Sequence, residues 1–480
     1  MKQTVLLLAV LLLWGAPDTV KAQSIAFTNV TVINVAEGTA VSGMNVVVAG
    51  DRIAAVGKAD GVEIPAGATV IDGNGKFLIP GLWDMHVHSS SDSITRNVFL
   101  PLYIANGVTG VRDLTGDCFS PCSSTQSSIV EARQWRKEIA DGRLVGPVII
   151  SSSPIIYGQQ PGEPSSVEEP ATAEEGRALV QLMADRGVDF IKVYDELPRE
   201  AFFGIMDEAN RLGLPVVGHV PLGVPVSEAA EAGMRSMEHL YPVIDECSSR
   251  EDELRPQQVE AARNGEVRLL FENLFRSMAA FRTEKCNSLY QALALQEVWQ
   301  VPTLIASEAA ENGVWWRDDP RMVYIPRKER DLWMWELATE IITIPGGLSG
   351  LPILTEKIRQ ISLDMFRAGV PVLAGSDTGV RGIFPGFSLH GELEALVRAG
   401  LSPAEALRAA TFEPAVYLEA TDSLGTVEAG KLADLVLLEA NPLEDITNTQ
   451  RIMVVVTRGR LFDRNALDEL MAGAKRAAQE

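Results

Sequence analysis

Eight short apolar runs alternate with helical patterns through the middle of this chain of 480 residues. Amphipathic helical patterns lie between the runs, for example over residues 174–186 and 199–212. Strands that alternate with helices form parallel sheets, and eight such units predict an α/β fold, the (β/α)8 or TIM barrel. The active site of such a barrel lies at the carboxyl ends of its strands. Here the runs end near His88, Asp113, Ser153, Tyr194, His219, His239, Ala306 and Asp377.

The two ends of the chain carry β-rich segments. Residues 25–33 and 45–49 are rich in apolar and β-branched residues, and residues 433–438 and 452–456 repeat this character late in the chain. We therefore expect both ends to form one small β-sandwich domain, with the barrel inserted between them. The predicted parts are a β-sandwich of residues 23–80 and 419–465, a barrel of residues 81–418 and a C-terminal helix of residues 466–480.

Residues 1–22 have the composition of a signal peptide. Lys2 provides the positive end, residues 5–14 provide the apolar region, and Val20 and Ala22 suit a cleavage site. A membrane anchor is the alternative, but the apolar run is short for one. We therefore expect an exported protein, periplasmic or secreted, with no membrane span after removal of the signal.

The chain has four cysteines. Disulfides are permitted in an exported protein. The pairing with the shortest loops joins Cys118 to Cys122 and Cys247 to Cys286, but four cysteines allow three pairings and the sequence does not choose between them. Zinc binding by these thiols is the alternative, and no CxxC pair supports it.

The charge balance of the chain is strongly acidic. The formal net charge is −22, and cleavage after residue 22 would make it near −23 because Lys2, Lys21 and Asp18 would be lost. Such a surface repels phosphate backbones, which argues against nucleic acid as a partner. The plainer interpretation is that the charge keeps the protein soluble.

Two connections between predicted barrel strands are long. Residues 245–300 hold an extended helical pattern before strand seven, and residues 307–350 follow strand seven on the active-site face. The second connection predicts either a lid or substrate wall, or a small core of its own in which aromatic rings pack together. It contains four of the eight tryptophans, Trp315, Trp316, Trp333 and Trp335.

Four of the five histidines end apolar runs. His86 and His88 close one such run, and alternation along a strand points both imidazoles to the same side. Two neutral imidazoles on one side form half of a metal site. A lysine within such a run is costly to bury alone. The further polar residues at the run ends are Lys192, His219, His239 and Asp377.

In these residues the chain resembles the amidohydrolase superfamily, in its imidazolonepropionase-like and prolidase-like branch. The resemblance covers nearly the whole mature chain. His-x-His alone would be a weak signal, but the combination with the later motifs is specific. The motifs are PGLWDMHVH at residues 80–88, LSPAEALRAAT at residues 401–411 and GTVEAGKLADLV at residues 425–436.

The resemblance implies a site for two divalent metal ions, which we expect to be zinc, although manganese, cobalt or iron would suit the same donors. Lys192 would be carboxylated by carbon dioxide, and the anionic carbamate would resolve the cost of burying a lysine. The alternative is a lysine that snorkels, or pairs with Asp195 or Glu196. The implied ligands are His86, His88 and Asp377 for the first metal, His219 and His239 for the second, and Lys192 as the bridge.

The resemblance also implies a mechanism. A hydroxide shared by the two metals would attack a polarised carbonyl, and Asp377 would act as general base and then as general acid. Our hypothesis is therefore a metal-dependent amidohydrolase that cleaves an amide (C–N) bond of a small molecule, such as a dipeptide or N-acyl amino acid. The alternatives are a lactone or phosphoester hydrolase on the same site, and a non-catalytic, metal-stabilised binding protein. A homo-oligomer is compatible with the sequence.

Four further residues are candidates for substrate binding. Tyr194, Tyr241 and Arg112 lie at or just after the ends of strands four, six and two, where they could bind a carboxylate or an oxyanion. His390 follows strand eight. The alternatives are ordinary packing, a loop hydrogen bond for His390, and an ion pair with Asp113 for Arg112. Dipeptidase activity is not assumed, because three loops differ from those of dipeptidase relatives: residues 193–198, 220–223 and 240–242.

Overall fold

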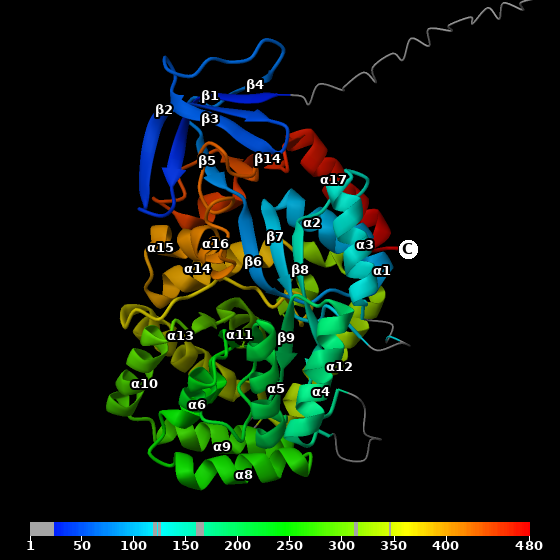
Figure 1. The fold of residues 1–480 in the computed structure, drawn as a ribbon, viewed down its shortest axis with the longest axis vertical. Helices are drawn as coiled ribbons and strands as arrows, with labels where there is room; N and C mark the ends of the chain where they lie inside the picture. Colours follow the sequence, from blue (N-terminus) through cyan, green and yellow to red (C-terminus); the bar gives the residue numbers. More distant parts are fainter. Residues whose placement is uncertain (1–23, 119–121, 123–125, 160–167, 312–314, 345–346) are drawn as a thin grey trace, which may run out of the picture.

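The computed structural model describes residues 24–118, 122, 126–159, 168–311, 315–344 and 347–480. The expected signal peptide, residues 1–22, lies outside the described residues. The described chain forms a barrel with a smaller β domain at one end and a set of helices at the other (Figure 1).

Seven parallel strands form the barrel wall, and they pair in their order along the chain. Their residues are buried on both faces of the sheet because helices cover the outside, which explains their continuous apolar character. The α/β barrel predicted from the sequence is confirmed. The strands are β6 Leu82–Val87, β7 Val108–Asp113, β8 Val148–Ile156, β9 Phe190–Val193, β10 Val216–Gly218, β11 Ser236–Glu238 and β12 Trp299–Val301.

Residues 370–378 fill the eighth position of the barrel without forming a regular strand. The Leu373 N–H donates to β12 (2.9 Å), and the Met85 N–H of β6 donates to this segment (2.9 Å). Isolated bridges join it to both neighbours. Pro371 has no N–H to donate, and Asp377 bends the chain with φ at 64°, so the ladder is interrupted. The segment that closes the barrel is therefore the one that carries Asp377.

Two strand ends differ from the sequence prediction. Strand seven is predicted to end near Ala306, but β12 ends earlier and Ala306 lies in helix α11 (Leu304–Glu311). Thr303 has φ at 46°, which ends the extended conformation before the helix begins. In the other direction, β8 continues past the expected end at Ser153.

Both chain ends build the small β domain, as the sequence predicts. The strands pair in the order β15-β14-β13-β5-β1-β2-β3, with β4 beside β1. Ile53 of β3 and Val454 of β14 belong to one apolar core although they lie near opposite ends of this order, so the sheet folds over on itself. The strands are β1 Ile25–Asn34, β2 Thr39–Ala49, β3 Arg52–Lys58, β4 Thr69–Asp72, β5 Phe77–Pro80, β13 Leu435–Leu438, β14 Ile452–Thr457 and β15 Arg460–Asp463.

Helices surround the barrel, and α17 (Arg464–Ala477) closes the chain beside α2. Short 3-10 and π segments connect some of them: η1 Thr95–Phe99 and η5 Ile446–Gln450. The barrel helices are α1 Asp92–Ile94, α2 Leu100–Ala105, α3 Ile129–Ala140, α4 Ala173–Arg186, α5 Arg199–Leu212, α6 Val226–Glu231, α7 Tyr241–Glu246, α13 Leu351–Arg367, α14 Phe387–Ala399, α15 Pro403–Ala409 and α16 Phe412–Tyr417.

The long connection before strand seven is helical, as expected. Helices α8 and α9 lie at the end of the molecule away from the β domain (Figure 1). A disulfide joins Cys247, after α7, to Cys286 in α10, and a second joins Cys118 to Cys122. Of the three pairings that the sequence allows, the structure has the one with the shortest loops. The helices of this connection are α8 Glu251–Arg263, α9 Val267–Ala279 and α10 Thr283–Leu295.

The connection after strand seven forms a small core of its own. Trp316 and Trp333 are buried and pack edge to face, with ring centroids 5.5 Å apart. Phe384, which follows Asp377 in the sequence, packs against Trp333 in the same core. Trp335 is 65% exposed, and the side chain of Trp315 lies outside the described part of the structure. After α11, the connection contains η2 Trp315–Asp318, η3 Pro320–Tyr324, α12 Arg327–Thr343 and η4 Gly347–Gly350.

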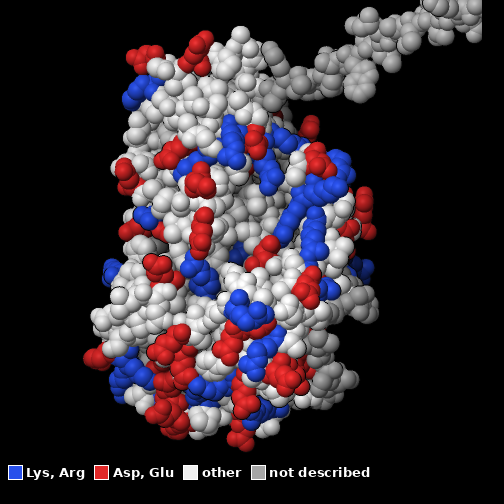
Figure 2. Space-filling model, viewed as in Figure 1, with Lys and Arg blue, Asp and Glu red and all other residues white. Residues whose placement is uncertain are grey.

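Charges of both signs are interspersed on the face drawn in Figure 2. This face therefore shows no continuous basic track of the kind that follows a nucleic-acid backbone. Among the described helices, none combines the length and the apolar composition that a membrane span requires.

Candidate metal centre

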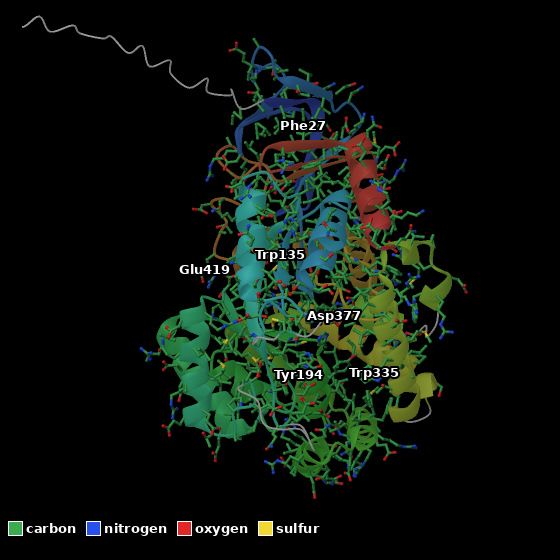
Figure 3. All side chains as sticks on the ribbon, turned by 90° about the vertical axis from the view of Figure 1, so that its right-hand side faces the viewer. Phe27, Trp135, Tyr194, Trp335, Asp377 and Glu419 are labelled. Atoms are coloured by element: carbon green, nitrogen blue, oxygen red, sulfur yellow. A yellow bond between two sulfur atoms is a disulfide. The ribbon has the colours of Figure 1, made fainter. Side chains whose placement is uncertain are left out.

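The six predicted ligands come from five different positions in the barrel wall and meet at its carboxyl end. His86 lies in β6 and Lys192 in β9, and the other four stand at or beyond strand ends. Figure 3 places Asp377 on the side of the barrel away from the β domain, which is marked by Phe27. The fold thus brings together residues that are far apart in sequence, because parallel strands present their carboxyl ends on one face.

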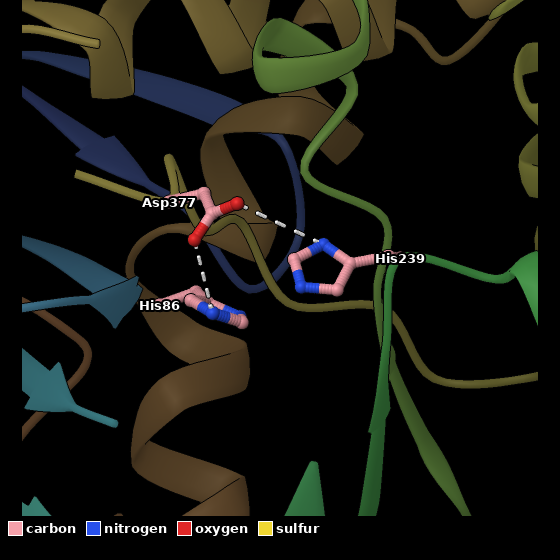
Figure 4. Close-up of side chains that lie close together, drawn as sticks. All are labelled: His86, His239 and Asp377. Atoms are coloured by element: carbon pink, nitrogen blue, oxygen red, sulfur yellow. Dashed lines mark ion pairs between the residues drawn. The ribbon is translucent and has the colours of Figure 1, made fainter. Parts of the chain in front are cut away.

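Asp377 lies at the centre of this group. Its Oδ1 is 3.0 Å from His88 Nε2 and 3.2 Å from His86 Nε2, and its Oδ2 is 4.0 Å from His239 Nδ1. His86 and His239 flank the carboxylate in Figure 4. One ligand atom from each of these three residues lies within 4.8 Å of the others, so residues expected to hold the first ion and the second ion lie side by side. His219 completes the group, with its ring centroid 4.8 Å from that of His239.

Each of the four histidines has its Nδ1 atom engaged by a neighbouring side chain. His86 Nδ1 lies 2.8 Å from Glu238 Oε2, and His219 Nδ1 lies 3.0 Å from Asp195 Oδ2. The other two histidines are held by threonine hydroxyls: His88 Nδ1 by Thr115, and His239 Nδ1 by Thr303 at 2.7 Å. An engaged Nδ1 leaves Nε2 as the free donor atom, which is the arrangement that metal-binding histidines adopt.

Lys192 is buried, and its Nζ has no hydrogen-bond partner among the described residues. Burial disfavours the ammonium form and lowers the pKa of Lys192 to about 8, although Glu238 and Asp377 act in the opposite direction. The alternative pairing with Asp195 is not observed, because that carboxylate is bonded to His219. A buried lysine close to its neutral form is a suitable nucleophile for carbon dioxide.

Burial and neighbouring charges keep three of these side chains in the protonation states that bind metal ions. Burial lowers the pKa of His219 and of His239 well below the usual range, so both are neutral imidazoles. Burial alone would raise the pKa of Asp377, but His86 and His239 bring it well below its usual range. Neutral imidazoles beside a permanent carboxylate match the nitrogen and oxygen donors that divalent transition metals prefer.

The donor set therefore fits a pair of divalent metal ions. Among the residues that the structure describes, neither His86 Nε2 nor Lys192 Nζ has a hydrogen-bond partner, and both atoms are buried. Unpartnered buried polar atoms are costly, and a cation for the imidazole and a carboxylate group on the amine would satisfy both.

Glu238 is a site residue that the sequence analysis missed. It directly precedes His239 in β11, is buried, and contacts both His86 and Arg112. Burial alone would raise the pKa of Glu238, but Arg112 and His86 bring it well below its usual range. The available signal was an acidic residue one position before a strand-end histidine. Neighbouring residues of a strand point to opposite sides, so the side chain of Glu238 does not follow that of His239.

Two predicted substrate contacts are wrong. Arg112 is buried inside the barrel, where it pairs with Glu238 at 2.8 Å and not with Asp113, so no substrate can reach it. His390 is also buried: its Nδ1 lies 2.9 Å from the Thr449 hydroxyl and its Nε2 lies 3.0 Å from the Asn106 carbonyl. Asn106 precedes β7 and so lies at the amino end of the barrel, opposite the site. The loop hydrogen bond considered for His390 is the correct interpretation.

The two tyrosines lie beside the metal ligands. The Tyr194 ring stacks on His219 with centroids 4.1 Å apart, and the Tyr241 ring is 6.3 Å from that of His239. Tyr241 is 37% exposed, so it stands at the mouth of the site. Both remain candidates for substrate contact.

Comparison with known proteins agrees with this geometry. The model of the amidohydrolase family matches residues 323–462. Those residues include Asp377 and the motif at residues 401–411. Together with the geometry of the site, this match supports membership of the amidohydrolase superfamily. Ochratoxinase of Aspergillus niger is 24% identical to this chain over 407 residues, which cover 80% of this chain and 75% of the relative.

Solved structures extend the likeness to the whole fold. A candidate prolidase from Bifidobacterium longum is 25% identical, with a TM-score of 0.63, over 95% of this chain and 99% of the other. A bottromycin amidohydrolase has a TM-score of 0.72 at 24% identity, over 95% of this chain and 90% of the other. These likenesses support the barrel fold and the prolidase-like branch, and the chain is a hydrolytic enzyme. The alternative of a non-catalytic binding protein is therefore set aside.

Proposed function

We propose that this amidohydrolase is an exported enzyme that uses two divalent metal ions, with zinc as the expected metal, to cleave the amide bond of a small molecule such as a dipeptide or N-acyl amino acid. The single observation that carries the proposal is the convergence of four imidazoles and Asp377 beside a buried lysine that has no hydrogen-bond partner in the described part of the chain. Such a cluster is costly to bury unless it holds cations.

The chain offers donors for both ions. The first ion would be held by His86, His88 and Asp377, the second by His219 and His239, and a carboxylated Lys192 would stand between them. When bound, such ions supply a hydroxide at neutral pH and polarise a carbonyl oxygen. Lys192 reaches the carboxylated form through its neutral amine, which its burial favours.

Asp377 is the proton carrier of the proposed reaction. Its Oδ1 contacts His86 and His88, whereas its Oδ2 lies 4.0 Å from His239 Nδ1, a longer contact. Oδ2 can therefore take the proton from the attacking water and deliver it to the leaving nitrogen. Its low pKa keeps Asp377 in the basic form that the first of these transfers needs.

The substrate class is argued from the walls of the site. Tyr194 and Tyr241 place two rings beside the histidines of the second ion, and aromatic walls suit a flat or apolar group next to the scissile bond. Relatives of similar fold are named ochratoxinase and Xaa-Pro dipeptidase, and both names point to small substrates. Two disulfides support export, because such bonds persist mainly outside the cytosol.

The first experiment measures metal content and intact mass of the mature protein. We expect about two metals per chain and a mass excess of one carbon dioxide, which maps to Lys192 and is lost in Lys192→Arg. Protein without metal that stays inert after addition of zinc and bicarbonate would contradict the proposal.

The second experiment compares bonds. Xaa-Pro dipeptides, N-acyl amino acids and ochratoxin are tested as amides, beside a lactone and a phosphoester matched in size. We expect turnover of at least one amide, with the lactone and phosphoester slower. Preference for the lactone or phosphoester would move the assignment to another hydrolase class on the same site.

A further inference from the structure

We propose that Glu238 and Arg112 are positioning residues for the first metal: the Glu238 carboxylate fixes the proton of His86 on Nδ1, and Arg112 fixes the carboxylate. The inference rests on the proposed metal site and adds to it two residues that no substrate or metal touches. Its basis is a chain of contacts that begins inside the barrel and ends at His86.

Arg112 is held in one position by its donors. Its Nε donates to the Met85 carbonyl (2.7 Å), its Nη1 to the Ser236 hydroxyl (2.8 Å) and the Tyr417 hydroxyl (2.9 Å), and its Nη2 to Glu238 Oε1 (2.8 Å). The planar guanidinium fork makes such a set rigid. Arg112 therefore bonds to β6 at Met85, one residue before His86, and to β11 at Glu238.

Glu238 divides its two oxygens between these partners. Oε1 accepts from Arg112 and from the Ser236 hydroxyl (2.8 Å), and Oε2 lies 2.8 Å from His86 Nδ1. Because an ionised carboxylate only accepts hydrogen bonds, His86 must carry its proton on Nδ1. In the neutral imidazole, which is the form that binds a metal, the lone pair is then on Nε2, the atom that faces Asp377 at 3.2 Å.

A buried ion pair with a purely structural role is the competing explanation. Replacement of such a pair as a whole by apolar residues often leaves stability unchanged. If the role is purely structural, loss of the pair would not change which nitrogen of His86 is protonated. A positioning role predicts a different outcome. Loss of the carboxylate charge must then lower the affinity for the first metal, beyond any effect on the stability of the fold. The two explanations therefore differ in metal affinity.

The test is the variant Glu238→Gln, which keeps the shape and one acceptor but removes the charge. We expect affinity for the metal of the first site to fall about 10- to 100-fold, as is usual when an outer carboxylate partner is removed. Chelator competition measures affinity, and the visible spectrum of the cobalt-loaded protein reports on the His86 ligand. Neither readout requires turnover.

The matched control is Glu392→Gln. Glu392 is also a fully buried glutamate; its Oε2 accepts the Ile305 N–H (2.8 Å), and within the described part of the chain it makes no hydrogen bond to any of the six candidate ligands. Its replacement is expected to leave metal affinity and cobalt spectrum unchanged. Equal loss of affinity in both variants would show a general effect of replacing a buried glutamate and would overturn the proposal.

A milder variant guards against loss of folding. Ser236→Ala removes the hydroxyl that bridges Arg112 and Glu238 but keeps both charges, and we expect a smaller fall in affinity in the same direction. Glu238→Asp is expected to recover part of the affinity. Wild-type protein that binds no metal would overturn the proposed function, whereas wild-type binding with affinity unchanged in Glu238→Gln and Ser236→Ala would overturn this inference alone.

Discussion

Two residues of the metal centre have backbone conformations that side chains seldom adopt. His239 and Asp377 have φ at 65° and 64°, in the left-handed region. Each ends a strand position in the barrel wall, and the turn redirects its side chain toward the site. Conformations of this kind persist where the surrounding structure enforces them, and they gather at functional sites. Here the Asp377 N–H is held by the His86 carbonyl at 2.8 Å.

The proposed proton transfer depends on the charge of Asp377. Asp377→Asn keeps the shape but cannot take a proton, so we expect kcat/KM to fall about 10²- to 10⁴-fold, the usual contribution of a general acid–base group. Steady-state kinetics with the preferred amide, after metal loading has been checked, measures the effect. Activity at the wild-type level in a metal-loaded variant would remove Asp377 from the mechanism.

Glu392 makes stability depend on pH. Burial raises the pKa of Glu392 from 4.5 to about 8 in the folded protein, so between these values the unfolded chain ionises and the folded chain does not. The contribution of Glu392 to the free energy of unfolding is therefore constant below about pH 4.5. It falls as pH rises to about 8, by at most about 5 kcal/mol.

Glu392→Gln removes this dependence. We expect the variant and the wild type to have similar stability near pH 5 and the variant to be the more stable at pH 8, since a neutral amide has no charge to bury. Denaturant unfolding of both proteins across this range measures the difference. A difference that stays constant with pH would contradict the assignment.

At the scale of residues, sequence reasoning located the candidate ligands but not the residues that hold them. His86, His219 and Lys192 could be found because each is a rare polar group in an apolar run, and the family resemblance then assigned the roles. Glu238 was missed because an acid beside a histidine looks ordinary in sequence. Arg112 was misplaced because a strand end can point inward, toward the barrel core, as readily as toward a substrate.

Among the elements, α12 is fastened to loops of the metal centre. Glu329 of α12 accepts from the Ser90 hydroxyl (2.6 Å), and the Trp333 indole donates to the Gly379 carbonyl (3.4 Å). Ser90 lies just after His88, and Gly379 just after Asp377. The connection after strand seven thus supports the two loops that carry His88 and Asp377, while Trp333 also packs on Trp316 and Phe384.

Two tryptophans of the same helix provide a matched pair of variants. Trp333 is 2% exposed and Trp335 is 65% exposed. We expect Trp333→Ala to lower the free energy of unfolding by about 3–5 kcal/mol, because it leaves a cavity beside Trp316. Trp335→Ala should change it by less than about 0.5 kcal/mol. Denaturant unfolding measures both, and equal effects would contradict the packing described for this helix.

The order of the elements could be predicted, but some of their ends could not. The alternation of apolar runs with helical patterns predicts a parallel barrel, and this prediction does not depend on the loops. The end of strand seven was misplaced because the apolar run continues into α11, and periodicity cannot separate a short buried strand from the helix that follows. The irregular eighth position follows from Pro371 and the turn at Asp377, whose conformation is a tertiary effect.

Across the whole molecule, the two chain ends support the strand that bears His86. β5 of the β domain continues through Gly81 directly into β6, and β13 from the C-terminal end pairs with β5. The Gly81 N–H donates to the Asp434 carbonyl at 2.8 Å. A side chain at Gly81 would collide with Thr109, its Cβ being 2.0 Å from that hydroxyl. The β domain therefore anchors one side of the metal centre.

The metal ions should in turn stabilise the whole barrel. The candidate ligands come from β6, β9, the ends of β10 and β11, and residues 370–378, so ions bound at the proposed site would join strands on both sides of the closure. The unfolded chain cannot assemble this set, and an ion present at about a hundredfold excess over its Kd adds about 2.7 kcal/mol to stability. We expect a chelator to lower Tm, zinc to restore it in a concentration-dependent way, and magnesium, which disfavours imidazole ligands, to have no such effect. Thermal unfolding measures this, and a Tm indifferent to both chelator and zinc would mean that the four imidazoles are stable without any ion between them.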